Sequence, residues 1–203
     1  MIWKVEDSHF DGWGQDHWVP QDFDPVARID SSPRRVSQML FHPTAEHVLA
    51  AASGDGCVKL WDLGSLDSPK STLGAHMPAQ ATQSLAFNAV GNSLVTTCKD
   101  NAIRLFDPRT GGDPVRVAET YKAVRIVWMG EENSFVTTAF DRSGNRQVGI
   151  WDAGSLKALK TITLDQTSGV IMPFWSDNGL LFLAGKGYFR LSFPPILLPY
   201  LRF

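Results

Sequence analysis

The sequence predicts an all-β fold made of repeated small antiparallel sheets, and three observations lead to this prediction. The pairs Trp61-Asp62, Phe106-Asp107 and Trp151-Asp152 follow one another at intervals of 45 residues. Each pair ends a run in which apolar residues alternate with other residues, which is the period-2 pattern of a strand. A short turn with an aspartate precedes two of the pairs by six residues, at Asp55 and Asp100. The repeating unit is therefore built of strands and not of helices.

The predicted elements follow the same order in each unit. A strand that ends on an aromatic residue comes first, then a second strand, a tight turn and the strand that closes on the aromatic-Asp pair. In the tight turn we expect the aspartate to accept backbone N–H groups and a Gly or Asn to adopt a positive φ. The whole units span about residues 33–62, 76–107 and 120–152, and a partial unit spans about 165–187.

Strand-only repeats of about 40–45 residues that close on Trp-Asp are typical of the WD40 blade, a four-stranded sheet of a β-propeller. The sequence therefore predicts an incomplete WD40-type β-propeller over residues 1–187, with about three whole blades and a partial blade at each end. The residues that define the repeat are Asp55, Trp61, Asp62, Asp100, Phe106, Asp107, Trp151 and Asp152, together with His76, which we expect to be a structural partner of a turn aspartate.

The two ends of the chain carry further expectations. Residues 2–5 are predicted to be the last strand of a preceding blade, and 169–175 with 180–185 the opening strands of a following one. The apolar, proline-rich residues 188–203 do not continue the repeat. Because an incomplete ring leaves blades without a neighbour, we expect exposed apolar side chains and aggregation of the isolated chain. The side chains expected to be exposed are Val170, Ile171, Phe174, Leu181 and Leu183.

Several stretches are more specific than a general WD40 pattern. They are residues 41–49, 98–109, 146–152, 169–175 and 183–187, and in order and separation they resemble the coronin family. The resemblance covers residues 1 to about 187. It implies a seven-bladed propeller that binds F-actin in the cytoplasmic actin cytoskeleton, followed by a linker and a coiled coil that oligomerises and engages the Arp2/3 complex. The sequence contains no heptad pattern, so Arp2/3 binding and coiled-coil oligomerisation are not expected from this chain.

Basic residues in loops are the candidates for contact with actin, because the filament is acidic and propellers bind partners through their loops. The candidates are Arg34, Arg35, Lys99, Arg142 and Arg146, and for each the alternative is an ordinary solvated side chain. Two other basic residues, Lys59 and Arg104, fall in the middle of predicted strands. We expect them to be solvated on a polar sheet face.

Composition argues against several other functions. With 19 basic and 21 acidic residues the formal net charge is −2, which gives no attraction of the whole domain to nucleic acid or anionic lipid. No apolar run is long enough to predict a membrane span. Cys57 and Cys98 are expected to be free thiols in a reducing cytosol.

Motifs of catalysis and of cofactor binding are not found in the sequence. The five histidines are scattered, so no metal site is predicted. Gly185-Lys186-Gly187 lacks the spacing of a phosphate-binding loop, and no Gly-x-Ser-x-Gly elbow is present. We therefore expect a non-enzymatic protein with no catalytic residues, metal or cofactor.

A general WD-repeat adaptor is the alternative function. Asp107-Pro108-Arg109 resembles the Trp-Asp-x-Arg box by which substrate receptors of cullin-type ubiquitin ligases dock on their linker protein. The same three residues also fit the coronin resemblance, so the motif does not decide between the two functions.

Overall fold

The computed structural model describes residues 1–19, 22–74 and 80–185. They fall into two units, Met1–Asp30 and the chain from Ser31 onward. His76, for which we expect a structural role, lies outside the described residues, and so does the tail 188–203.

In the first unit, the strand predicted for residues 2–5 is wrong. Ile2 forms one isolated antiparallel bridge with Ala27, through N–H to carbonyl distances of 2.8 and 3.3 Å. A short 3-10 helix, η1 (Asp7–Phe10), follows. A strand needs a partner along its length to be stable, and the described residues of this unit supply one only at Ile2. The ring of His9 stacks on Phe23 with 4.4 Å between ring centroids.

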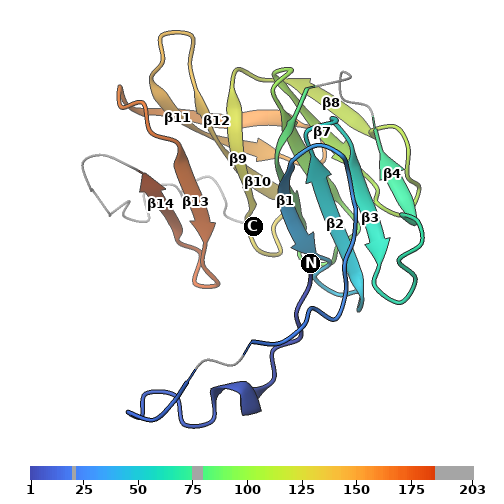
Figure 1. Cartoon of the computed structure of the whole chain (residues 1–203). Coiled ribbons are helices and arrows are strands. Elements are labelled where there is room, and N and C mark those ends of the chain that lie inside the picture. The colour runs from blue at the N-terminus through green and yellow to red at the C-terminus, as the bar shows by residue number, and fades with distance from the viewer. Residues whose placement is uncertain (20–21, 75–79, 186–203) are drawn as a thin grey trace. The chain divides into compact units, whose positions relative to one another are not determined.

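The second unit confirms the all-β prediction, with three four-stranded antiparallel sheets and one β-hairpin (Figure 1). The first sheet consists of β1 (Val36–Phe41), β2 (Val48–Ser53), β3 (Val58–Asp62) and β4 (Ser71–Leu73). The second consists of β5 (Thr82–Phe87), β6 (Leu94–Cys98), β7 (Ala102–Phe106) and β8 (Arg116–Glu119). The third consists of β9 (Ala123–Trp128), β10 (Ser134–Phe140), β11 (Arg146–Asp152) and β12 (Lys157–Asp165). The hairpin consists of β13 (Ile171–Trp175) and β14 (Leu181–Gly185).

The sheets are offset from the sequence units. Trp61, Phe106 and Trp151 lie in the third strand of their sheets, and the fourth strand comes from the segment after the aromatic-Asp pair. The aspartate of each pair closes the turn that leads out of the third strand. Asp62 accepts the N–H of Gly64 at 2.9 Å, and Asp152 accepts that of Ser155 at 2.6 Å.

The predicted chemistry of the tight turns is confirmed. Asp55 accepts the N–H of Cys57 at 3.0 Å, and Gly56 has a φ of +83°. In the second sheet Asp100 accepts the N–H of Ala102 at 3.1 Å, and the positive φ belongs to Asn101, at +61°. Each aspartate thus replaces a missing strand partner for a backbone donor at the tip of the hairpin.

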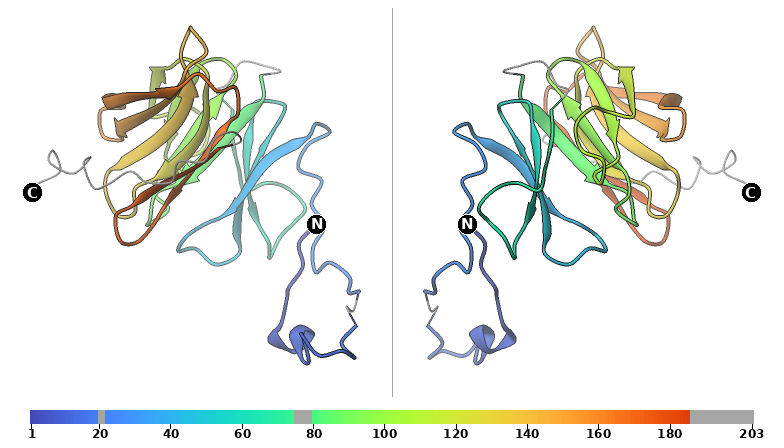
Figure 2. Two further views of the ribbon diagram at one scale, coloured as in Figure 1. Left: turned by 90° about the vertical axis from the view of Figure 1, so that its left-hand side faces the viewer. Right: turned by 90° about the vertical axis from the view of Figure 1, so that its right-hand side faces the viewer.

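Three apolar clusters of the described residues hold neighbouring sheets together. Figure 2 shows the twisted sheets from two further sides. The cluster between the first and second sheets contains Ala50, Ala52, Val58, Leu60, Leu73, Leu85, Leu94 and Phe106. The cluster between the second and third contains Val95, Ile103, Leu105, Ile126, Trp128, Phe135 and Trp151. The third joins Met129, Val136, Val148 and Ile150 to Trp175, Leu181 and Leu183 of the hairpin. Each fully buried large side chain contributes about 1.5–3 kcal/mol.

The prediction that Lys59 and Arg104 are solvated is wrong. Arg104 is 8% exposed, and its guanidinium forms an ion pair with Asp100 at 2.8 Å. The Lys59 ammonium donates a hydrogen bond to the carbonyl of Ser31 and lies 3.9 Å from Asp55. For Arg104 the physical reason is that the second sheet is packed on both faces, so strand alternation creates no solvent face there. Lys59 shares a sheet face with the exposed Met39, and it is held instead by its contacts with Ser31 and Asp55.

The expected apolar exposure is confirmed at some positions and wrong at others. Phe174 is 54% exposed and Val170 is 38% exposed. Ile171 is buried, and Leu181 and Leu183 pack against the third sheet, because alternation turns them toward that sheet and turns Phe174 away. At the other end of this unit, Met39 and Phe41 on β1 are 52% and 60% exposed, as expected for a sheet face without a neighbour.

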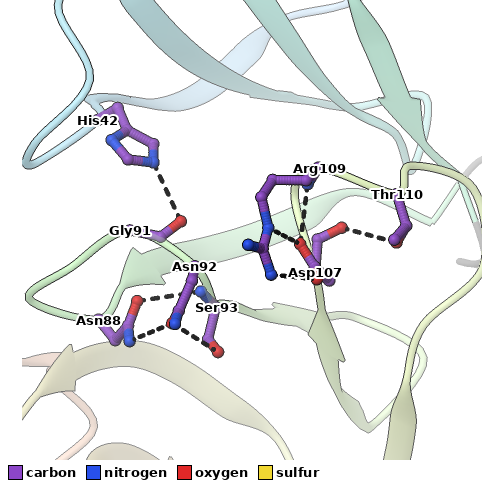
Figure 3. Close-up of polar contacts among 8 residues, drawn as sticks. All are labelled: His42, Asn88, Gly91, Asn92, Ser93, Asp107, Arg109 and Thr110. Atoms are coloured by element: carbon purple, nitrogen blue, oxygen red, sulfur yellow. Dashed lines mark hydrogen bonds and ion pairs between the residues drawn. The ribbon is translucent and has the colours of Figure 1, made fainter.

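His42 connects the first sheet to the second through a hydrogen bond to Gly91 (Figure 3). Nδ1 of His42 accepts the backbone N–H of Ala45 at 2.8 Å, so the ring proton is on Nε2, which donates to the carbonyl of Gly91 at 3.0 Å. The imidazole also lies 5.0 Å from the ring of Phe87. Gly91 has a φ of +80°, and a Cβ there would lie 2.0 Å from Cε1 of His42.

An ion pair fixes the end of the third sheet. Nε of Arg146 donates to Oδ1 of Asp165 at 2.6 Å, and Nη2 donates to the second carboxylate oxygen. Nη1 of Arg146 reaches the carbonyl of Gly169 at 3.4 Å, just before the hairpin. The hydrogen bonds from Arg146 hold the pKa of Asp165 well below its usual range.

The contact between His42 and Gly91 predicts that Gly91→Ala lowers the free energy of unfolding by about 3 kcal/mol. The new methyl group would clash with the His42 ring, and alanine also carries the penalty of a positive φ. Gly144→Ala is the matched control, because Gly144 has a φ of +83° and open space around it. We expect this control to lose about 1 kcal/mol. Urea unfolding followed by tryptophan fluorescence measures the free energy of unfolding of both variants. Equal losses in the two variants would contradict a stabilising contact between His42 and Gly91.

The ion pair predicts a particular pH dependence of stability. In the unfolded chain Asp165 protonates near about pH 3.9, and in the folded chain it protonates at a lower pH. The contribution of the Arg146–Asp165 pair to the free energy of unfolding is therefore present above about pH 4 and is lost as the pH falls further. Between about pH 5 and 2 the unfolding free energy should fall less steeply in Asp165→Asn than in the wild type. An Asp177→Asn control should behave as the wild type, and parallel curves for wild type and Asp165→Asn would refute the role of the pair.

Candidate functional site

The direction of the strands sorts the connections of the second unit onto two edges. The first strands of successive sheets, β1, β5, β9 and β13, lie side by side. Ser37 at the start of β1 donates to the carbonyl of Thr82 at the start of β5, at 2.6 Å, and His42 after β1 meets Gly91 after β5. These strands therefore run in the same direction.

We call the two edges the turn rim and the loop rim. The turn rim comprises the tight turns and the segments that enter the sheets, namely residues 32–35, 54–57, 99–101, 120–122 and 141–145. The loop rim comprises residues 42–47, 63–70, 88–93, 107–115, 129–133 and 153–156.

Four of the five basic candidates lie at the turn rim, and the fifth, Arg146, is the first residue of β11 next to it. Arg34, Arg35, Lys99 and Arg142 are exposed there, and they come from three different sheets. Arg34 and Arg35 are held against the tight turn of the first sheet. Nη1 of Arg34 donates to the carbonyl of Gly54 at 3.3 Å, and the carbonyl of Arg35 accepts the N–H of Gly54 at 2.9 Å.

Arg146, at the start of β11, differs from the other four. Its side chain is only 7% exposed and is occupied by Asp165 and by the carbonyl of Gly169. The guanidinium therefore cannot meet a partner without leaving these contacts. No sequence signal indicated this pairing, because Asp165 lies 19 residues away on the next strand.

The aspartates of the turn rim are occupied by their own turns. Asp141 accepts the N–H groups of Ser143 and Asn145, each at 2.8 Å. The side-chain hydrogen bond from Asn145 is the main cause that lowers the pKa of Asp141. Partial burial raises the pKa of Asp55, but hydrogen bonds from Ser53, the N–H of Cys57 and Ser32 lower it more. These carboxylates stay ionised at neutral pH but are directed to internal donors.

Sequence reasoning missed one exposed cation of this rim, Lys122, in the connection between β8 and β9. Its N–H donates to Oδ1 of Asn101 at 3.1 Å. The tight-turn pattern could not find it, because blade connections follow no fixed turn motif. The positive φ of Lys122, +43°, is likewise invisible in the sequence.

Among its described residues, the loop rim has an excess of exposed acidic residues over its two exposed cations, Lys70 and Arg109. Its exposed acidic residues are Glu46, Asp67, Asp113, Glu131 and Glu132. The chain is nearly neutral as a whole, so its charge is distributed unequally between the two rims. A partner with many carboxylates would therefore be attracted by the turn rim and repelled by the loop rim.

Asp107 and Arg109, the motif of the adaptor alternative, lie on the loop rim (Figure 3). Nε and Nη2 of Arg109 donate to the two carboxylate oxygens of Asp107 at 3.0 and 2.8 Å. These hydrogen bonds lower the pKa of Asp107. The Arg109 side chain is 73% exposed, but its paired face is turned to its own loop.

Other kinds of site find no support in the part of the chain that the structure describes. Over residues 1–19, 22–74 and 80–185 no three His, Cys, Asp or Glu side chains gather in a way that could hold a metal ion. In the same ranges no helix is long and apolar enough to cross a membrane. Burial raises the pKa of both free thiols, Cys57 and Cys98.

Comparison with known proteins agrees with this architecture. The family "WD domain, G-beta repeat" matches residues 23–62 and 67–107. The WD40 domain of a Toxoplasma gondii coronin has a similar structure, with a TM-score of 0.72 and 22% identity over 81% of this chain and 43% of that one. This likeness shows the fold, a WD40-type β-propeller, whose ring the described residues do not close.

The similar sequences are coronins. A coronin-like protein of Schizosaccharomyces pombe is 37% identical over 92% of this chain and 30% of its own length. A coronin-like protein of Saccharomyces cerevisiae is 34% identical over 92% of this chain and 29% of its own length. Human coronin-2A is 37% identical over 76% of this chain. The chain thus spans about 30% of the length of these relatives. With WD40 repeats, the fold of a coronin propeller and this similarity along almost all of its length, the chain belongs to the coronin family.

Proposed function

We propose that this chain is part of an actin-filament-binding platform of the cytoplasmic actin cytoskeleton, which acts by binding and not by catalysis. The observation that carries the proposal is the position of four exposed basic residues, Arg34, Arg35, Lys99 and Arg142, on one rim of a coronin-family propeller. The coronin resemblance implies F-actin as the partner, and the acidic filament surface is complementary in charge to this rim.

The geometry suits a weak, wide contact and not a pocket. The basic residues come from separate sheets whose mutual position is fixed by apolar packing. Tight turns closed by Asp55 and Asp100 present the neighbouring cations on short, rigid connections. Such preorganised charges raise the association rate and orient the partner more than they add affinity. Binding should therefore weaken as salt rises, because exposed charges are screened beyond about 8–10 Å at physiological ionic strength.

The adaptor alternative receives less support. Arg109 is exposed, but its carboxylate partner Asp107 already binds it at two nitrogen atoms. Pull-down with the ligase linker protein in parallel with F-actin separates the two functions, since the linker would address the loop rim and actin the turn rim.

The proposal predicts that Arg34→Glu with Arg35→Glu lowers F-actin affinity about tenfold, because two attractive contacts become repulsive. The fold should be retained, since exposed loop substitutions change stability by about 0.5 kcal/mol or less. Co-sedimentation with F-actin at low salt measures the effect, with an actin-free sample to subtract self-aggregation.

Lys157→Glu with Lys160→Glu is the matched control for this experiment. Both lysines are exposed on β12, and the double change alters the net charge equally. The control should bind as the wild type. Equal affinities of the two double variants would remove Arg34 and Arg35 from the contact, and a wild type that does not sediment with actin above the blank would refute the proposed function.

A further inference from the structure

The connection between β8 and β9 is fastened to the turns of two neighbouring sheets. In the second sheet, Asn101 accepts the N–H of Thr120 on its backbone carbonyl at 2.8 Å and that of Lys122 on its side chain at 3.1 Å. In the third sheet, the N–H of Phe140 donates to the carbonyl of Lys122 at 3.3 Å. Residues 120–122 are therefore held at both sides.

The backbone of this connection is fixed in an uncommon conformation. Asn101 has a φ of +61° and Lys122 a φ of +43°. A lysine with a positive φ is rare and persists where the surroundings over-determine the backbone. Here three hydrogen bonds to Asn101 and Phe140 do so. The starting point of the Lys122 side chain is consequently set before any partner arrives.

The exposed end of the connection combines a cation with an aromatic ring. Nζ of Lys122 lies 5.4 Å from the centroid of the Tyr121 ring. Tyr121 is 36% exposed. Tyrosine is enriched in protein interfaces, where its ring supplies contact area at little entropic cost.

Lys122 also lies on a connection next to two turns that carry other exposed cations. Lys99 lies in the turn that contains Asn101, and Arg142 lies in the turn that follows Phe140. The backbone of Lys122 is hydrogen-bonded to Asn101 in the first of these turns and to Phe140, the residue that precedes the second. The turn carboxylates nearby are engaged internally, Asp100 by Arg104 at 2.8 Å and Asp141 by its own turn. One exposed carboxylate, Glu119 at the end of β8, precedes the connection.

The geometry points to Lys122, with Tyr121 beside it, as a further contact residue of the turn rim, which meets a protein surface rich in carboxylates. Asn101 is its positioning residue. The inference rests on the proposed function for the identity of the partner, F-actin. It extends that function by adding an exposed cation on a connection that is hydrogen-bonded to both the second and the third sheet.

The test compares the full chain with the variants Lys122→Glu, Asn101→Gly and Lys157→Glu. Lys157 is exposed at the start of β12, beside the loop rim, and its reversal changes the net charge equally. Glycine at 101 keeps the positive φ and the backbone bond but removes the side-chain acceptor. Affinity is measured by F-actin co-sedimentation with an actin-free blank over a series of salt concentrations, and by binding of a poly-glutamate peptide.

Lys122→Glu should weaken actin binding about fivefold and reduce its salt dependence, whereas Lys157→Glu should leave both unchanged. Asn101→Gly should weaken binding by a smaller factor with the salt dependence of the wild type, since no charge is lost. An unchanged affinity in Lys122→Glu, with wild-type binding intact, would overturn the inference and leave the proposed function standing. If the wild type failed to bind actin, the proposed function would fall, and poly-glutamate binding would decide the inference: equal binding by wild type and Lys122→Glu would overturn it.

Discussion

Face-to-face packing of whole sheets is the constraint on which this structure depends. The second sheet is covered by the first on one face and by the third on the other, so Leu94 and Val95, neighbours on one strand, are both fully buried. Polar side chains on such strands have no solvent to meet and need internal partners. The Arg104–Asp100 pair and the bond from the Trp151 indole to Thr137 at 2.9 Å meet that need. The arrangement leaves the rims, the outermost sheet faces and the outer strands β8 and β12 in contact with water.

Side chains also complete the backbone bonding where neighbouring sheets meet. The first strands of two adjacent sheets run in the same direction, and β5 has no strand partner on the side facing β1. The amide of Gln38 fills this gap. Its Oε1 accepts the N–H of Leu85 at 3.0 Å, and its Nε2 donates to the carbonyl of the same residue at 3.1 Å. Ser84 repeats the device one sheet further, where its hydroxyl accepts the N–H of Ile126 at 3.2 Å. Burial of these backbone groups is therefore not accompanied by a loss of hydrogen bonds.

The sequence predicts what is local and periodic, and it fails where long-range packing decides. The turn chemistry of Asp55 and Asp100 is encoded within a few residues, and the structure confirms it. The regular recurrence of Trp61, Phe106 and Trp151 indicates repeated sheets, and these residues lie in equivalent strands. The burial of Arg104 was not predictable from the alternation of residues along the strand. Alternation indicates that a strand has two faces, but it does not indicate what packs against each face. The position of Lys122 depends on Asn101, 21 residues earlier in the chain. Residues 2–5 resemble a strand in composition, but a strand requires a neighbour, and among the described residues Ala27 alone pairs with this segment, at Ile2.

In the tight turns of the turn rim, aspartates close the backbone and neighbouring basic residues face solvent, which affects how the binding surface can change between related proteins. Carboxylates close the turns from inside, as Asp141 does with two backbone N–H groups. The basic residues next to them, Lys99 and Arg142, are exposed and leave this closure to the aspartates. Substitution of a lysine or arginine on the rim therefore leaves the turn intact, whereas loss of the aspartate opens it. A propeller of this kind can in this way exchange one binding specificity for another through a few surface residues while its turns keep their hydrogen bonds.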